Sequence, residues 1–181
     1  MKYDKIMVAT DVHGSSDVGK KLVEIMQQEG AEALVIMGDF YYHGPRNPLP
    51  QGHGPMALCE AFNAIRDKII AIRGNCDANI DEMISEFEFS DYKSLEVGGK
   101  SITFTHGHLY NEAKFPFNTT NLMFGHTHVN VVYDTEDKLA INLASCSLPK
   151  NMCPPSYAII ENGEVTVYDL NGNKLNIIKL K

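Results

Sequence analysis

The sequence predicts an α+β and α/β fold in which two mixed β-sheets pack as a sandwich with flanking helices. Three observations predict it. Apolar strands alternate with amphipathic helices in the first half, short apolar runs separated by turn residues follow in the second half, and polar residues come directly after five of the strands. The 181 residues are expected to form a single domain, 1–181, because this length suits one domain and no linker or repeat interrupts it.

The first half has the order β-α-β-α-β, which requires a mostly parallel sheet with right-handed crossovers. Strands are expected at 6–10, 33–37 and 68–73, and helices at 16–29 and 56–66. In the first helix, Leu22 and Met26 have helical spacing, Ser15 or Ser16 can cap the beginning, and Gly30 can end it.

The second half is expected to form hairpins. Gly98-Gly99 and Asn162-Gly163 are two-residue turn signals between apolar runs. The expected strands are 92–97, 101–105, 122–124, 130–134, 139–143, 156–160, 165–168 and 175–180. Because consecutive hairpin strands pair antiparallel, we expect these strands to form a second sheet that packs on the first.

Charge and hydropathy exclude several classes of protein. The net charge is -7, from 16 Lys+Arg and 23 Asp+Glu, and no basic stripe is present, so no long nucleic acid is expected as a partner. No apolar run reaches the ~18 to 20 residues of a membrane span, and the first residues have no signal-peptide pattern. We therefore expect a cytoplasmic protein that does not bind membranes. The four cysteines lack metal or redox spacing and are expected to be reduced.

Five strands run directly into clusters of Asp, His and Asn. The clusters are Asp11-Val12-His13-Gly14, Gly38-Asp39, Gly74-Asn75-Cys76-Asp77, His106-Gly107-His108 and Gly125-His126-Thr127-His128. One such cluster alone is more often a turn or a helix cap. Five in series indicate a functional site, because the carboxyl ends of parallel strands form the edge where open α/β sheets bind ligands.

These side chains are of the type that binds metal. Oxygen and imidazole ligands without thiolate suit Mn, Fe, Zn, Co or Ni. Seven candidate ligands are too many for one ion, but would suit two ions ~3.5 to 4 Å apart that share one carboxylate and a hydroxide. The seven are Asp11, His13, Asp39, Asn75, His106, His126 and His128.

The motif series resembles that of the calcineurin-like metallophosphoesterases, and most of the chain is similar to small prokaryotic phosphodiesterases of the YfcE type. The resemblance includes the segment His43-Gly44-Pro45-Arg46-Asn47-Pro48 after Asp39. It implies the metallo-dependent phosphatase fold, two divalent ions with manganese expected first, and a homodimer or tetramer. It also implies that Asp11, His13 and His128 bind one ion, that Asn75, His106 and His126 bind the other, and that Asp39 bridges them.

The function that the resemblance implies is hydrolysis of small phosphodiesters by in-line attack of a metal-bridging hydroxide. Catalytic roles are expected for Asp39, Asn75, Cys76, Asp77 and His108. Asp77 is expected to orient a metal-binding histidine, with metal binding as the alternative. His108 is equally compatible with a phosphate or outer metal contact and with packing against Tyr110.

The chain departs from the family pattern at one position and in one short segment. Cys76 stands where many members have a histidine that is thought to protonate the leaving group, and a thiol is a poor substitute, which favours activated diesters. The segment Asn142-Leu143-Ala144-Ser145 replaces the Asn-Pro-Gly-Ser common in the YfcE type. His43 and Arg46, in the long loop after Asp39, are candidate substrate contacts, and a solvated proline-rich loop is the alternative for each.

Two other functions are compatible with the same pattern. A non-catalytic scaffold that binds protein partners is one, because the retromer subunit Vps29 resembles this fold. A scaffold does not need a full set of metal ligands, however, and all seven are present here. A phosphomonoesterase on the same centre is the other, and only Cys76 argues against it.

Overall fold

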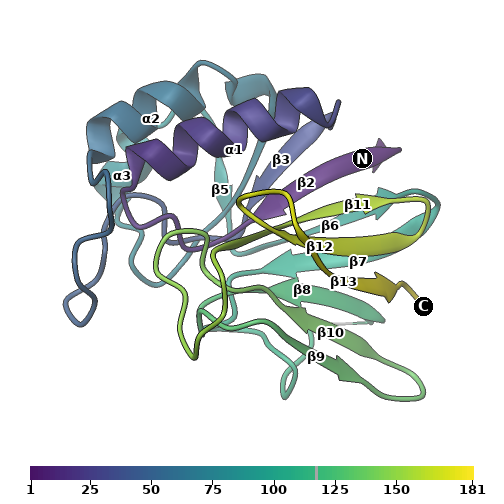
Figure 1. The fold of residues 1–181 in the computed structure, drawn as a ribbon. Helices are drawn as coiled ribbons and strands as arrows, with labels where there is room; N and C mark the ends of the chain where they lie inside the picture. The colour runs from purple at the N-terminus through teal and green to yellow at the C-terminus, as the bar shows by residue number, and fades with distance from the viewer. Residues whose placement is uncertain (117) are drawn as a thin grey trace.

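The computed structural model describes residues 1–116 and 118–181 and consists of two β-sheets and three α-helices (Figure 1). The larger sheet contains, in spatial order, β13 (Lys174–Lys179), β12 (Glu164–Asp169), β11 (Ser156–Glu161), β2 (Lys5–Ala9), β3 (Ala33–Ile36), β4 (Ile69–Ile72) and β5 (Phe89–Ser90). The smaller sheet contains β1 (Lys2–Tyr3), β6 (Tyr92–Val97), β7 (Lys100–Thr105), β8 (Asn121–Phe124), β10 (Leu139–Asn142) and β9 (Val131–Asp134). This arrangement confirms the predicted sandwich.

The helices all lie over the outer face of the larger sheet, as Figure 1 shows. They are α1 (Ser16–Gln28), α2 (Pro55–Asn63) and α3 (Asn79–Ile84), and a short 3₁₀ helix, η1 (Arg66–Lys68), precedes β4. Ser15 caps α1 as predicted, because its hydroxyl accepts a hydrogen bond from the amide of Val18, and Gly30 follows the helix at φ 65°. The sequence did not predict α3, which is only six residues long. No helix among the described residues is both long and apolar enough to cross a membrane.

The placement of the last three strands corrects one prediction. We expected every second-half hairpin to join the second sheet. Instead β11 pairs antiparallel with β2, with Ala158 opposite Val8, so that β11, β12 and β13 extend the first sheet. The physical reason is burial: 156–160 is buried throughout, and a strand buried on both faces is stable only inside a sheet that is covered on both sides.

Two hydrophobic cores hold the larger sheet in place. Between the sheets, Val8 and Val35 pack with residues such as Phe104 and Ile141 of the smaller sheet. On the other face, the helices bury a second cluster that includes Leu22, Met26, Leu58, Phe62 and Phe40. Because both faces of β2, β3 and β4 are packed, the carboxyl ends of these strands form a fixed edge from which the predicted metal ligands extend.

Candidate metal centre

The five predicted clusters meet at one edge of the sandwich. They follow β2, β3 and β4 of the larger sheet and β7 and β8 of the smaller sheet. Backbone hydrogen bonds join the loops to one another: the amide of Asp11 donates to Gly38 O at 3.0 Å, that of His13 to Asp39 O at 2.9 Å, and that of Gly125 to His106 O at 2.9 Å. The ligand positions are therefore fixed by the main chain before any ion binds.

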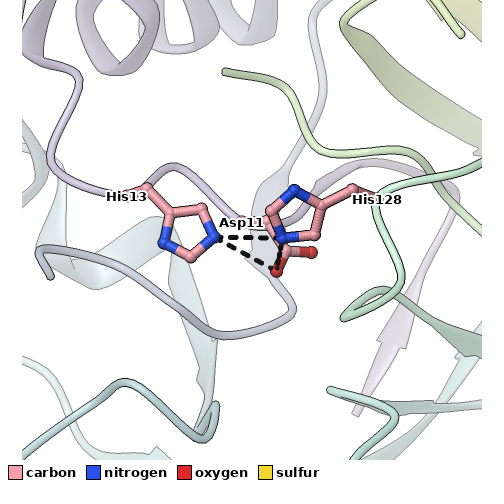
Figure 2. A group of neighbouring side chains, drawn as sticks. All are labelled: Asp11, His13 and His128. Atoms are coloured by element: carbon pink, nitrogen blue, oxygen red, sulfur yellow. Dashed lines mark hydrogen bonds and ion pairs between the residues drawn. The ribbon is translucent and has the colours of Figure 1, made fainter. Parts of the chain in front are cut away.

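One half of the centre consists of Asp11, His13 and His128, all buried (Figure 2). The Nε2 atoms of His13 and His128 are 3.2 Å apart. Asp11 Oδ1 lies 3.3 Å from the Nε2 of His128 and 3.6 Å from that of His13. Figure 2 shows that the three atoms converge on one point from two neighbouring loops. These three residues form a group whose ligand atoms all lie within 4.8 Å of one another.

The hydrogen bonds of the two rings show what this point can bind. Nδ1 of His13 faces the carbonyl of Tyr42 at 2.8 Å, and Nδ1 of His128 faces the carbonyl of Leu148 at 2.5 Å. A carbonyl only accepts, so in a neutral ring each Nδ1 carries the proton and each Nε2 presents a lone pair. Asp11 Oδ1 has no hydrogen-bond donor among the described residues. Three electron-pair donors with no hydrogen between them fit a cation.

Hydrogen bonds to its second oxygen, Oδ2, hold the carboxylate of Asp11 in its orientation. Oδ2 accepts a hydrogen bond from the Thr10 hydroxyl at 2.7 Å and another from the amide of His126 at 3.0 Å. Burial by itself would raise the pKa of Asp11, but the imidazoles of His106, His128 and His13 outweigh burial and hold the pKa well below its usual value. Asp11 is therefore ionised at neutral pH, as a metal ligand must be.

The second half of the centre is built around His106. Its Nδ1 faces Met37 O at 2.7 Å, so its Nε2 is also a lone-pair donor, and this atom lies 3.0 Å from Asn75 Oδ1. The amide nitrogen of Asn75 donates to Cys76 Sγ at 3.3 Å, which leaves the amide oxygen directed at the imidazole. As in the first half, electron-pair donors face each other without a proton between them.

Asp39 lies between the two halves. Its Oδ1 is 3.4 Å from His106 Nε2, and its Oδ2 is 3.7 Å from His13 Nε2. Each carboxylate oxygen therefore faces one half. Among the described residues, the group Asp11, Asp39 and His106 also has its ligand atoms within 4.8 Å of one another, which links the halves through two carboxylates.

His126 completes the second half less tightly. Its ring lies beside that of His106, with the ring centroids 5.0 Å apart, and makes no hydrogen bond with any described residue. Burial, followed by the charge of His106, lowers the pKa of His126. The ring is therefore neutral at pH 7 and can donate a lone pair.

Five of the seven predicted ligands adopt a left-handed backbone conformation. Their φ values are 55° for Asp11, 51° for His13, 57° for Asp39, 70° for His126 and 64° for His128. Residues other than glycine seldom adopt this conformation, and it costs about 1 to 3 kcal/mol at each position. Backbone strain of this kind clusters at functional sites, because the direction of the side chain matters more there than local stability.

The glycines beside the ligands allow the loops to approach closely. A Cβ at Gly125 would lie 2.0 Å from the Thr10 hydroxyl and 2.6 Å from Asp11 Oδ2. A Cβ at Gly74 would lie 2.1 Å from Asp39 Oδ1. Both positions therefore need glycine for space, and each glycine places one ligand loop directly against another.

Asp77 does not have the expected role. Its carboxylate accepts hydrogen bonds from the backbone amides of Phe40 at 2.7 Å, Gly74 at 2.7 Å and Asp39 at 2.9 Å, rather than from an imidazole. Burial raises its pKa to about 6, so it is ionised at neutral pH. Asp77 thus holds the backbone of the central carboxylate residue in its strained conformation.

Cys76 lies at the rim of the second half. Its backbone amide donates to Asp39 Oδ1 at 2.9 Å. Burial, followed by the charge of Asp39, raises the pKa of its thiol to about 12. The side chain is therefore a neutral thiol near pH 7, and a thiol with this pKa is a weak proton donor.

A cavity of about 630 Å³ opens over the centre. Asp39, Asn75, Cys76, Asp77, His126 and His128 line one part of it, and Tyr42, Gly44, Pro45, Arg46, Asn47 and Lys150 line the remainder together with Ala78. Of the two predicted substrate contacts, Arg46 lines the cavity and His43 does not. The His43 ring packs instead against Tyr42 and His53, at centroid distances of 4.9 and 5.8 Å.

His108 packs among the imidazoles rather than facing the cavity. Its ring centroid is 5.3 Å from that of His106 and 6.3 Å from that of His126. Its Nδ1 is buried without a hydrogen-bond partner among the described residues, and burial lowers its pKa. The ring thus lies beside two predicted metal ligands, and the outer metal contact stays a prediction.

Sequence reasoning assigned no role to Ser145 or Lys150. The Ser145 hydroxyl donates to Asp11 O at 2.7 Å and accepts from the amide of Leu148 at 2.8 Å, and Leu148 in turn orients the His128 ring. The departure at Asn142-Leu143-Ala144-Ser145 drew attention to this segment, but nothing in the sequence alone showed that it lies against Asp11. Lys150 follows on the same loop and reaches the cavity.

Comparison with known proteins agrees with this geometry. Residues 5–164 match the model of the calcineurin-like phosphoesterase superfamily domain. The chain is 36% identical to Phosphodiesterase YfcE of Escherichia coli K12 over 174 residues, 94% of this chain and 95% of that protein. The solved structure of the E. coli protein matches with a TM-score of 0.92 over 98% of this chain and 100% of its own.

More distant proteins are similar in sequence or in structure. Phosphodiesterase MJ0936 of Methanocaldococcus jannaschii is 24% identical over 78% of this chain and 84% of its own. Vacuolar Protein Sorting 29 of Cryptosporidium parvum matches with a TM-score of 0.63 at 19% identity, over 97% of this chain and 96% of its own, which shows a common fold alone. With a family model that matches most of its length and a relative that is 36% identical over 94% of it, the chain belongs to the calcineurin-like phosphoesterase superfamily.

Proposed function

We propose that this protein is a phosphodiesterase with a dinuclear metal centre that hydrolyses small phosphodiesters. The observation that carries the proposal is the pair of lone-pair clusters that share the Asp39 carboxylate. In the proposal, Asp11, His13 and His128 hold one ion, Asn75, His106 and His126 hold the other, and Asp39 bridges them. The likeness to a named phosphodiesterase over 94% of the chain supports the choice of reaction.

When bound, two divalent ions would lower the pKa of water enough to supply the nucleophile and would stabilise the charge on the phosphate oxygens. The chain's own residues hold that chemistry in place. The carbonyls of Tyr42, Leu148 and Met37 fix three imidazoles with Nε2 directed inward. Asp77 and Ser145 are positioning residues, and Arg46 is a substrate contact in the wall of the cavity.

Cys76 sets the preference for diesters in this proposal. A neutral thiol with a pKa near 12 gives little help to a poor leaving group, so substrates whose leaving group departs readily are favoured. The proposal further includes manganese as the ion, a homodimer or tetramer as the assembly and the cytoplasm as the location, with zinc, iron, cobalt and nickel as competing ions.

The direct test is metal analysis of the purified protein together with a hydrolysis screen of activated diesters and monoesters. We expect two ions per chain, hydrolysis of bis(p-nitrophenyl) phosphate, and the largest loss of both for Asp39→Ala. The control is Glu136→Ala, which removes an exposed carboxylate from the β9–β10 turn. A single ion at full metal supply, with normal turnover in Asp39→Ala, would contradict the proposal.

A protein-binding scaffold is the second candidate, favoured by the fold that the chain shares with Vacuolar Protein Sorting 29. Chelation separates the two functions. For an enzyme, chelation abolishes hydrolysis and leaves a folded protein whose stability falls only by the contribution of ion binding, about 2.7 kcal/mol at 100-fold excess over Kd. A metal-replete protein that hydrolyses no phosphate ester and unfolds on chelation would support the scaffold.

A further inference from the structure

The walls of the cavity carry positive charge that the metal centre does not use. Arg46 and Lys150 both line the cavity, are exposed, and make no ion pair with any described residue. The chain as a whole is acidic, with 23 carboxylate residues against 16 Lys+Arg. Two unpaired cations in one cavity of an acidic protein require an explanation beyond general surface charge.

The carboxylates of the cavity do not neutralise these cations. Asp39 faces the imidazoles of both halves of the centre, and Asp77 accepts three backbone hydrogen bonds. Both acidic groups are therefore committed to the centre. The remaining wall carries only positive charge and favours an anionic group of the substrate.

Lys150 is held in a defined position relative to the centre. Its backbone amide donates to His128 O at 2.9 Å, while the ring of the same histidine is bonded to Leu148 O. At the other end of the segment, Ser145 is bonded to Asp11 O. The loop that carries Lys150 is thus attached to two predicted ligands, so its backbone holds a fixed position relative to the centre, and the side chain extends from there into the cavity lining.

The cavity has space for more than the reacting phosphate. Its volume of about 630 Å³ lies within the range of sites that enclose a drug-sized ligand. We infer that Lys150, together with Arg46, determines specificity for phosphodiesters in which a substituent carries a second anionic group. This inference rests on the proposed phosphodiesterase function and adds the charge of the preferred substrate class.

A matched pair of substrates tests the inference. The first is p-nitrophenyl 4-carboxyphenyl phosphate. The second, p-nitrophenyl 4-carbamoylphenyl phosphate, has an uncharged carbamoyl group in place of the carboxylate. The two diesters therefore differ by one charge on the substituent, far from the leaving group. We expect the wild type to prefer the carboxylate in kcat/KM, and Lys150→Gln to reduce that preference about two- to fivefold, the effect of one partly solvated ion pair. The preference should also fall as salt concentration rises.

A charge-matched variant outside the cavity serves as the control for Lys150→Gln. Lys20→Gln changes the net charge equally, lies on α1 away from the cavity lining, and should keep the preference. Equal loss on both substrates in Lys150→Gln, or a wild type without preference, would overturn the inference. If neither diester is hydrolysed at full metal supply, the proposed function fails. The inference can then still be tested by calorimetry, which gives the Kd of each diester for the wild type and for Lys150→Gln. The ratio of the two Kd values in each protein decides whether the cavity selects the second charge.

Discussion

The two ends of the β-sandwich use left-handed backbone conformations in opposite ways. At the hairpin end, Gly98, Gly99 and Gly163 adopt positive φ values of 54°, 79° and 75°, and Asn162, a residue type that tolerates this conformation in turns, adopts 51°. Glycine adopts them at no steric cost. At the ligand end, the same conformation is adopted by Asp11, His13, Asp39, His126 and His128, for which it is strained.

The difference shows where the chain gives up stability for function. A turn needs only a change of direction, and glycine supplies it. A ligand needs the same change of direction and a side chain as well, so the strain has to be balanced by surrounding bonds. Those bonds include the carboxylate of Asp77 on the amide of Asp39, and the hydroxyls of Ser145 and Ser147 on the carbonyl of Asp11.

Apart from Asp39→Ala, for which the greatest loss of activity is expected, the largest effect is expected at His126, where activity and strain can be separated. His126→Ala and His126→Gly should each lower kcat/KM for an activated diester by about 10⁴-fold or more, the scale of losing a group essential to catalysis. In the metal-free protein, His126→Gly should unfold with a free energy about 1 kcal/mol higher than His126→Ala, because only glycine relieves the strain at φ 70°. Equal stability of the two variants in chemical denaturation would mean that the ligand end stores no strain here.

The next effect concerns a ligand-end residue whose φ is not positive. Cys76→His should raise the rate on phenyl phosphate, a monoester with a poor leaving group, by about 10²-fold, the lower end of what general acid catalysis contributes. Cys76→Ser is the matched control, because it cannot act as the acid. Steady-state kinetics on monoester and diester measure the effect. If the wild type already prefers monoesters, or if neither rate changes, Cys76 does not set the preference.

A smaller effect is expected for a residue that supports a strained ligand. Ser145→Ala removes the hydroxyl that bonds Asp11 O and the Leu148 amide, and should weaken metal binding about tenfold. Ser147→Ala is the control, because it removes only the longer bond of 3.0 Å to the same carbonyl. Metal titration measures both affinities. A larger loss in Ser147→Ala would show that Ser145 does not support the centre.

The smallest effect on activity is expected at the hairpin end. Gly99→Ala places a side chain in open space at φ 79°, so it should cost about 1 kcal/mol of stability through backbone strain alone. Thermal and chemical unfolding measure that loss. Diester kcat/KM and metal content should equal those of the wild type; a change in either would indicate that the two ends are coupled.

Much of the fold follows from local sequence pattern. The helix at 16–29 and its cap at Ser15 were predictable, because capping and helical spacing are local properties. The placement of β11 was not, because Ser156–Glu161 reads as a hairpin strand and its second partner in the sheet, β2, is about 150 residues earlier in the chain. Strand partners across such distances are chosen by burial in the finished sheet.

The candidate site divides in the same way. The sequence by itself predicted which side chains meet at one edge, because Asp11-x-His13, Gly38-Asp39, Gly74-Asn75, His106 and His126-x-His128 each follow a predicted strand, and open sheets bind ligands at the carboxyl ends of their strands. Only the tertiary structure decided that Asp77 holds backbone amides instead of a histidine, that Ser145 supports Asp11, and that Lys150 reaches the cavity while His43 turns away. The physical reason is distance along the chain: Ser145 is 134 residues from Asp11, and no local propensity encodes a contact made only when two sheets have packed.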